Sequence, residues 1–174
     1  MLRWQKMVPT DLVFVERLGH ALYPNHPESL AAFETKFRAT EDACLIARDM
    51  ADNPVGYCIA VRAAFGHPPH LDDTRDPPRS ADCLHLHDLA LAPPARGQGL
   101  VAAAIAHLES AARGLPLTLI AVNGTRALWQ RYGFADAVCA YDLAADYGAD
   151  ARYMRRQQNP LRAAGCDARH GGSD

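Results

Sequence analysis

The clearest hydrophobic pattern in the chain runs from Cys83 to Arg113. Its first part is mostly apolar, as in a strand buried on both faces, and the prolines at 93 and 94 end it because proline lacks a backbone donor. From Leu100 to Gly114, apolar residues recur at steps of four, three and four and predict one buried helix face, formed by Val101, Ile105, Leu108 and Ala112. We therefore predict a strand, a turn with two glycines and a helix, in that order.

The pattern elsewhere predicts an α/β protein. Apolar runs predict strands at Leu2–Met7, Ala43–Asp49, Val55–Arg62, Leu117–Val122, Ala137–Tyr141 and Ala151–Arg156. Helix signals predict one helix that starts at residues 9–11 and ends near 19–23, a second that starts at residues 28–29, and a third that ends at residues 128–134. The proline-rich segment 63–81 is too long for an ordinary connection, so two interpretations stay open: a lid over a binding groove, or a mobile surface insertion.

Length and composition place these elements in one domain. The chain has 174 residues, and we expect a single domain over residues 1–156 followed by a disordered tail, residues 157–174. The net charge of −2 indicates neither a nucleic acid nor an anionic membrane as partner, and no stretch approaches the about 20 apolar residues of a membrane span. The N-terminus lacks the apolar segment of a signal peptide, and the five scattered cysteines are typical of reduced, buried side chains, so we expect a cytoplasmic protein.

The glycine turn ahead of the helix is a candidate phosphate site. A helix that starts directly after Gly97 and Gly99 presents unpaired backbone N–H groups and the positive end of its dipole. Position 102 is Ala where the dinucleotide fingerprint has its third glycine, and the chain has no Gly-Lys-Ser/Thr triplet of a nucleotide P-loop. On the turn alone, a tight strand–helix connection without a ligand remains an equal alternative.

The order of motifs over Leu84 to Ala135 resembles the GNAT superfamily of acetyl-CoA-dependent N-acetyltransferases. That superfamily has a Gln/Arg-x-x-Gly-x-Gly/Ala loop after its fourth strand, which corresponds here to residues 96–101, and an Asn-led helix that closes on Gly-Phe, here Asn123 and residues 133–134. Two positions depart from the pattern. Val101 stands where the family has Gly or Ala, and Trp129 stands where many members carry a tyrosine general acid.

The resemblance implies a fold and a cofactor. It implies a mixed, mostly antiparallel sheet of about six to seven strands, splayed at the fourth strand and flanked by about four helices. It also implies acetyl-CoA as co-substrate without a metal, a primary amine of a small molecule or peptide as acceptor, direct transfer in a ternary complex, and a monomer or homodimer. The expected cofactor-binding residues are Leu89, Ala90, Leu91, Arg96, Gly97, Gln98, Gly99, Leu100, Val101, Asn123 and Trp129.

The expected catalytic residues are Asp88 and His87. An ammonium with a pKa of about 10.4 must lose a proton before its nitrogen attacks, and a carboxylate or imidazole at this end of the strand would take it. The alternative is that Asp88 only orients His87 or caps a backbone amide. In the family the segment between the first two helices borders the acceptor, so Tyr23, His26 and Glu28 are candidate substrate contacts, against the alternative of an ordinary solvated loop.

Two other functions stay open at this stage. Because Trp129 cannot act as an acid, the chain is alternatively a catalytically weak acyl-CoA-binding regulatory protein. His85 and His87 lie two apart on one strand face, a spacing that can bind a metal, although no third ligand accompanies them. Turnover of the thioester and a metal analysis separate these hypotheses from the first.

Overall fold

The computed structural model describes residues 1–78 and 80–157. Its centre is a seven-stranded sheet in the order β1-β2-β3-β4-β5-β7-β6, in which only β4 and β5 run parallel. The strands are β1 (Arg3–Lys6), β2 (Leu45–Arg48), β3 (Pro54–Ala63), β4 (Cys83–Leu91), β5 (Leu117–Ala121), β6 (Ala135–Asp136) and β7 (Arg152–Arg156). The mixed, mostly antiparallel sheet is the fold that the resemblance implied.

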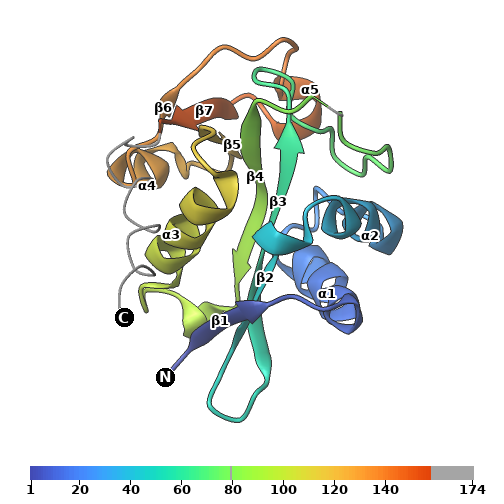
Figure 1. Ribbon diagram of the computed structural model, residues 1–174, viewed down its shortest axis with the longest axis vertical. Helices are drawn as coiled ribbons and strands as arrows, with labels where there is room; N and C mark the ends of the chain where they lie inside the picture. Colours follow the sequence, from blue (N-terminus) through green and yellow to red (C-terminus); the bar gives the residue numbers. More distant parts are fainter. Residues whose placement is uncertain (79, 158–174) are drawn as a thin grey trace, which may run out of the picture.

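Helices cover both faces of this sheet (Figure 1). On one face lie α1 (Leu12–Leu22) and α2 (Leu30–Ala39), and on the other lie α3 (Leu100–Ala112) and α4 (Arg126–Arg131). The fifth helix, α5 (Ala144–Tyr147), is a single turn between β6 and β7. The described residues thus form five α-helices, where about four were expected.

Side-chain alternation along β3 supplies a core to each face. Tyr57 and Ile59 pack with α1 and α2, whereas Cys58 and Ala60 pack with the apolar face of α3 that the sequence predicted. This alternation is the expected period of a strand buried on both sides. Cys44, Cys58 and Cys83 are buried free thiols, as expected, whereas the free thiol of Cys139 is only half-buried.

The parallel pair at the centre of the sheet is short. β4 pairs with β5 only from Leu84 to Leu86, opposite Leu117 to Leu119, although β4 continues to Leu91. Beyond Leu86 the two strands diverge, which is the splay implied for the fourth strand. The edge of β4 that faces β5 is therefore without a β5 partner over residues 87–91.

A β-bulge lies at the start of this divergence. In the pairing of β4 with β3, Leu86 is opposite Ala60 and Asp88 is opposite Ile59, so His87 is an extra residue. A bulge reverses the side-chain alternation beyond it. Asp88 consequently lies on the face of α1 and α2, the same face as His87, where strict alternation would have placed it on the opposite one.

The region after α4 differs from its prediction. No strand forms at residues 137–141, and the short β6 lies just before them at Ala135–Asp136. Residues 137–141 instead pass over a small cluster formed by Leu143, Tyr147 and Tyr153, and only the Ala137 N–H donates to a β7 carbonyl, that of Tyr153, among the backbone bonds of these residues. The alternating apolar residues that suggested a strand contribute to this cluster.

The proline-rich segment is packed against the protein. The strap, defined here as residues 64–78, and the segment 137–147 both lie at the upper end of the molecule in Figure 1, opposite the β2–β3 turn. Phe65 and Leu71 of the strap pack against the cluster of Tyr147 and Tyr153. The predicted tail lies outside the described residues from position 158 on. No helix in the described part of the chain is long and apolar enough to cross a membrane.

Candidate active site

The splay between β4 and β5 opens into a cavity of about 760 Å³. One wall comes from β4 and β5, another from the glycine turn and the start of α3, a third from α4, and the last from the segment between α1 and α2 with the strap and α5. Most of the lining is apolar, with a few polar groups from different elements, as is common for small-molecule sites. The cavity thus extends from the N-terminus of α3 to the segment between α1 and α2.

The glycine turn forms one end of the cavity. Gly97 and Gly99 have φ values of 73° and 79°, in the left-handed region that favours glycine. No side chain caps the first turn of α3, and a Cβ built on either glycine meets nothing within 4 Å. The backbone N–H groups of the α3 terminus are therefore open to the cavity side of the turn, which suits a phosphate.

Asp88 brings a carboxylate to the middle of the cavity. The Tyr57 hydroxyl donates a hydrogen bond to its Oδ2. Tyr57 fits there because Gly19 of α1 has no side chain: a Cβ at that position would lie 2.9 Å from the hydroxyl oxygen. Burial raises the pKa of Asp88 to about 6, and the bond from Tyr57 opposes this rise. Asp88 is thus ionised at neutral pH but close to its titration range.

His87, Glu28 and Lys36 form a second polar group, called here the buried triad. The His87 Nε2 lies 2.7 Å from Glu28 Oε1, and Lys36 Nζ donates to Glu28 Oε2 at 2.6 Å. The three side chains are 2%, 5% and 4% exposed. Burial opposes ionisation of Glu28, but the charges of and hydrogen bonds from His87 and Lys36 outweigh it and lower its pKa to about 2. Glu28 is therefore a carboxylate that accepts from both neighbours.

The triad leaves little of His87 open to the cavity. Its side chain is almost fully buried while the residue as a whole is half-buried, so the exposed part of His87 is mainly backbone. Its Nδ1 is buried and has no hydrogen-bond partner. His85, one step deeper on the same face, lies with its Nδ1 3.0 Å from the Thr118 hydroxyl, and burial lowers its pKa to about 3.

The end of the cavity beyond Asp88 is aromatic. Tyr23 and His26 reach it from the α1–α2 segment, and Tyr147 reaches it from α5, with the His26 and Tyr147 ring centroids 6.5 Å apart. Burial, reinforced by the charge of Asp88, raises the pKa of Tyr23 above its usual value. The Tyr23 hydroxyl is therefore a hydrogen-bond donor at neutral pH.

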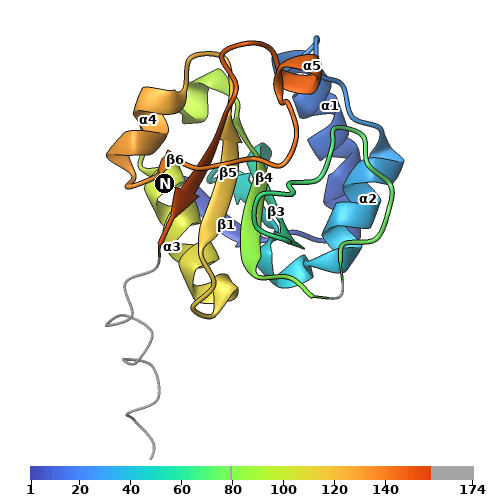
Figure 2. The ribbon, with the colours of Figure 1, turned by 90° about the horizontal axis from the view of Figure 1, so that it is seen from above.

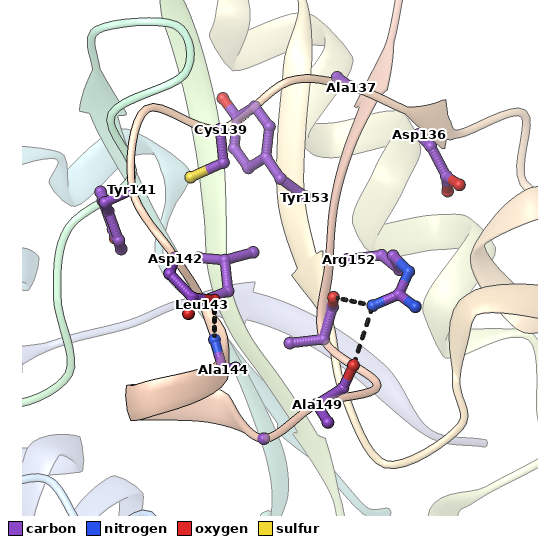
Figure 3. Close-up of a pocket in the computed structure, with 12 residues that line it drawn as sticks. Asp136, Ala137, Cys139, Tyr141, Asp142, Leu143, Ala144, Ala149, Arg152 and Tyr153 are labelled. Carbon is purple, nitrogen blue, oxygen red and sulfur yellow. Dashed lines mark hydrogen bonds between the residues drawn. The ribbon is translucent and has the colours of Figure 1, made fainter.

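A second, smaller hollow of about 260 Å³ lies beside β7, between this strand and residues 136–149 (Figure 3). Its polar groups are engaged with the protein itself. Arg152 donates to the carbonyls of Ala149 and Ala151, and Asp142 accepts from the Ala144 N–H. The larger cavity is therefore the candidate active site.

Comparison with known proteins fits this geometry. Residues 12–134 match the profile of the Acetyltransferase (GNAT) family. The chain belongs to the GNAT acetyltransferase family. The acyltransferase activity and the acetyl-CoA co-substrate expected from its motifs follow from this membership. No curated protein matches the sequence significantly.

Several solved structures are similar to this GNAT chain. The GphF GNAT-like decarboxylase in complex with isobutyryl-CoA has a TM-score of 0.70 and 17% identity, and the match covers 89% of this chain and 98% of that one. Ard1 from Thermoplasma volcanium has a TM-score of 0.68 and 15% identity, with 91% and 98% covered. Naa20 from Chaetomium thermophilum, in complex with a bisubstrate analogue, has a TM-score of 0.67 and 21% identity, with 91% and 86% covered. At these identities the likeness concerns the fold.

The cavity of this GNAT protein gathers nearly all residues predicted from the sequence. Those that line it are Tyr23, His26, Glu28, His87, Asp88, Leu89, Leu91, Arg96, Gly97, Gly99, Leu100, Val101, Asn123 and Trp129. Two predicted residues do not line it. Ala90 is fully buried in the core with α1 and α2, because beyond the bulge it points to that face. The Gln98 side chain instead donates to the Pro94 carbonyl at 2.7 Å.

The aromatic residues of α4 contact the cavity from the side of α3. Trp129 is half-buried and packs edge-on against Phe134, with ring centroids 5.7 Å apart. Tyr132, the residue after α4, is half-buried against the core and also lines the cavity. The indole at position 129 thus forms part of the wall at the position where many GNAT members carry their acid.

Sequence reasoning missed several residues of the site, among them Tyr57, Lys36, Leu71 and Tyr147. Lys36 had a usable signal: it lies one turn from Phe33, beside the apolar face of α2, where a lysine needs a buried partner. Tyr57 had none, because its place in an apolar strand does not show what its hydroxyl reaches. Among the described residues, no group of three or more His, Cys, Asp or Glu side chains is placed to hold a metal ion.

Proposed function

We propose that this protein is an N-acetyltransferase that moves the acetyl group of acetyl-CoA to a primary amine by direct transfer in a ternary complex. The observation that supports this most is the position of Asp88. Its carboxylate lines the same cavity as the open α3 terminus, between that terminus and the aromatic end. Both substrates can therefore occupy one cavity, with a proton acceptor between them.

Asp88 is the proposed general base. A bound ammonium group must lose a proton before attack, and a carboxylate with a pKa of about 6 accepts it more readily than an ordinary aspartate. The Tyr57 hydroxyl fixes the carboxylate in the cavity wall. His87, expected to act beside Asp88, is proposed as a positioning residue, because its imidazole is bound to Glu28 and its backbone forms the bulge.

The residues that would hold acetyl-CoA lie on two elements. The N–H groups at Gly97 to Val101 would bind the pyrophosphate, and Asn123 would reach the pantetheine arm. The unpaired edge of β4 near Leu89 and Leu91 would bind the pantetheine amides as a neighbouring strand does, and one of its N–H groups would stabilise the oxyanion. The thioester supplies an activated acetyl group and a leaving thiol with a pKa of about 8.5, which leaves as thiolate without an acid at Trp129.

The experiment combines binding with turnover. Acetyl-CoA is expected to raise the melting temperature of the wild type, because a ligand at about 100 times its Kd stabilises the folded state by about 2.7 kcal/mol. Asp88→Asn should keep this shift but lower kcat for acetylation of an amine panel, measured by CoA release and product mass, by about 10²–10⁴-fold. Asp76→Asn, an exposed aspartate paired with Arg38, is the matched control and should behave as wild type.

The outcomes separate the two functions. Acetyl-CoA binding by the wild type without CoA release for any amine would favour the regulatory acyl-CoA-binding protein. Full activity of Asp88→Asn would exclude Asp88 as the base and leave the transferase intact.

A further inference from the structure

The strap joins the two walls of the aromatic end of the cavity. On the α2 side, Asp72 Oδ1 accepts from the Ser29 N–H at 2.7 Å and from its hydroxyl at 2.6 Å. On the α5 side, the Tyr147 hydroxyl donates to the Pro69 carbonyl at 3.3 Å, and the Tyr141 hydroxyl donates to that of Pro68 at 2.8 Å. Five consecutive strap residues, 68–72, therefore span the gap between the walls.

Two further contacts fix the strap in this place. His70 stacks on Tyr141, with ring centroids 4.4 Å apart, and its Nδ1 lies 3.0 Å from Asp146 Oδ2. Leu71 lies between these tethers and is itself part of the cavity lining. Figure 2 shows the strap and the segment 137–147 together at the end of the molecule that faces the viewer. A polypeptide that leaves the cavity at this end would meet the strap.

The charged side chains near this end differ in how far they are already paired with one another. Asp88 and Glu28 contribute carboxylates, and both are held in place by protein donors. The lysine and arginine residues in the described lining are Arg96 and Arg131, which belong to the glycine turn and to α4. Arg96 is further engaged, because its Nε donates to the Leu91 carbonyl at 3.1 Å. Glu28 is paired with Lys36, so Asp88 is the carboxylate that this end offers an ammonium. The charge of Arg96 also acts on Tyr23, but Arg96 belongs to the glycine turn, at the proposed pyrophosphate end of the cavity. An acceptor carboxylate beside the amine would therefore lie against the like charge of Asp88.

Aromatic rings complete this environment. Tyr23, His26 and Tyr147 line the cavity next to Asp88, together with Leu71 and Ile120. Aromatic faces attract cations and pack well against flat apolar groups. The arrangement therefore combines an anionic group for the reacting nitrogen with an apolar surface for the rest of the acceptor.

We propose that the acceptor is a compact amine with an aromatic or apolar body and no carboxylate, enclosed beneath the strap. This proposal rests on the N-acetyltransferase function and specifies its substrate class. It excludes amino acids with a free carboxylate, which would lie against the Asp88 carboxylate beside the amine, and polypeptides, which need an open end.

The test uses a matched set of acceptors: tyramine, tyrosinamide, tyrosine, and an amidated tetrapeptide that begins with tyrosine. Tyrosinamide and tyrosine have nearly the same size and differ in the negative charge. We expect tyramine and tyrosinamide each to have a kcat/KM at least tenfold higher than that of tyrosine. We expect the same tenfold difference between these two amines and the tetrapeptide. Tyrosine used as well as tyrosinamide would overturn the charge argument, and a tetrapeptide used as well as tyrosinamide would overturn the enclosure.

A variant tests the strap directly. Asp72→Gly removes both bonds to Ser29 and suits the φ of 54° at this position, so it should raise the use of the tetrapeptide relative to tyrosinamide at least threefold. Asp52→Gly is its control, because Asp52 is also exposed, has a φ of 65°, and lies in the β2–β3 turn at the opposite end. An unchanged ratio for Asp72→Gly would contradict the role of the strap.

Equilibrium binding keeps this test separate from the proposed function. The same four compounds are titrated calorimetrically into the protein saturated with CoA, where no reaction occurs. If the transferase function failed, tyrosinamide would still bind at least tenfold more tightly than tyrosine. Equal affinities, or no binding of any of the four compounds, would overturn the proposal.

Discussion

Glu28 holds the buried triad together, and its replacement by glutamine gives the sharpest test of the structure. The variant removes a carboxylate that accepts from Lys36 at 2.6 Å and lies 2.7 Å from the His87 Nε2. It leaves the Lys36 ammonium, which is 4% exposed, without a counter-charge. Breaking a buried ion pair in this way costs about 3–5 kcal/mol. For a chain of this size, 3 kcal/mol corresponds to a fall in Tm of about 6–12 °C.

A second ion pair of the same length is the control. Arg156 Nη2 lies 2.6 Å from Glu109 Oε1, but the two side chains are 27% and 23% exposed. Since solvent screens this pair, Glu109→Gln should lower the free energy of unfolding by only about 1 kcal/mol. Urea unfolding at pH 7, followed by circular dichroism, measures both variants. If Glu28→Gln cost no more than Glu109→Gln, the reasoning on burial would be refuted.

The double variant distinguishes charge from packing. Lys36→Met removes the ammonium at similar volume, so adding it to Glu28→Gln eliminates the uncompensated buried charge. We expect the double variant to be more stable than Glu28→Gln alone. If the two substitutions were additive in their destabilisation, the cost of Glu28→Gln would come from lost packing.

The pH dependence of Glu28→Gln has a fixed sign. The pKa of Glu28 is about 2 in the folded protein against an ordinary value of 4.5. The ionised Glu28 therefore stabilises the folded protein fully above pH 4.5, and this contribution is lost as the pH falls through about 2. At pH 3 the contribution to the free energy of unfolding is already smaller by about 2 kcal/mol. Because glutamine does not titrate, the difference in unfolding free energy between wild type and variant should narrow by this amount between pH 7 and pH 3. A constant difference would contradict an ionised Glu28.

Two further predictions concern catalysis and the cofactor. Tyr57→Phe removes the hydrogen bond that opposes the rise in the pKa of Asp88. The acid limb of the pH profile of kcat/KM should therefore move up from about pH 6 by about one unit, whereas Tyr153→Phe should leave it unchanged. A midpoint that stayed at the same pH in Tyr57→Phe would show that Asp88 is not the catalytic base. Gly99→Ala and Gly114→Ala replace glycines that have φ values of 79° and 93° and no neighbouring atoms within 4 Å of a Cβ, so each should lower the free energy of unfolding by about 1–2 kcal/mol. Only Gly99→Ala, at the cavity end of α3, should weaken acetyl-CoA binding, by about tenfold in calorimetry. Equal affinities of the two variants for acetyl-CoA would contradict the phosphate site.

The local pattern of apolar and polar residues determined much of the secondary structure of this protein. The apolar run up to Leu91, the glycine turn and the period of residues 100–112 specified β4, the turn and α3, because each depends on neighbours within a few positions. The motif order was enough to identify the family and the cavity wall from Arg96 to Val101. The prediction was wrong at residues 137–141, where the alternating apolar side chains pack into a cluster and no strand forms.

Other features depended on contacts between distant segments. The extra residue at His87 arises from the register of β4 against β3, and it alone turns Asp88 toward Tyr57 and α1. Glu28 was predicted to contact substrate from its place in the loop, yet Lys36 and His87 engage both of its oxygens. Its role as a substrate contact therefore stays a prediction that the variant at this position also tests.

The sequence alone therefore determined most of the segments that form the sheet, where the glycine turn lies and which family the chain belongs to. The tertiary structure decided which polar groups face one another. Lys36 lies 8 residues from Glu28, but His87 is 59 and Asp72 is 44 residues away from it, and the strap meets α5 across 78 residues. A hydrogen bond depends on positions within a few tenths of an ångström, and no periodicity along the chain specifies such positions for segments this far apart.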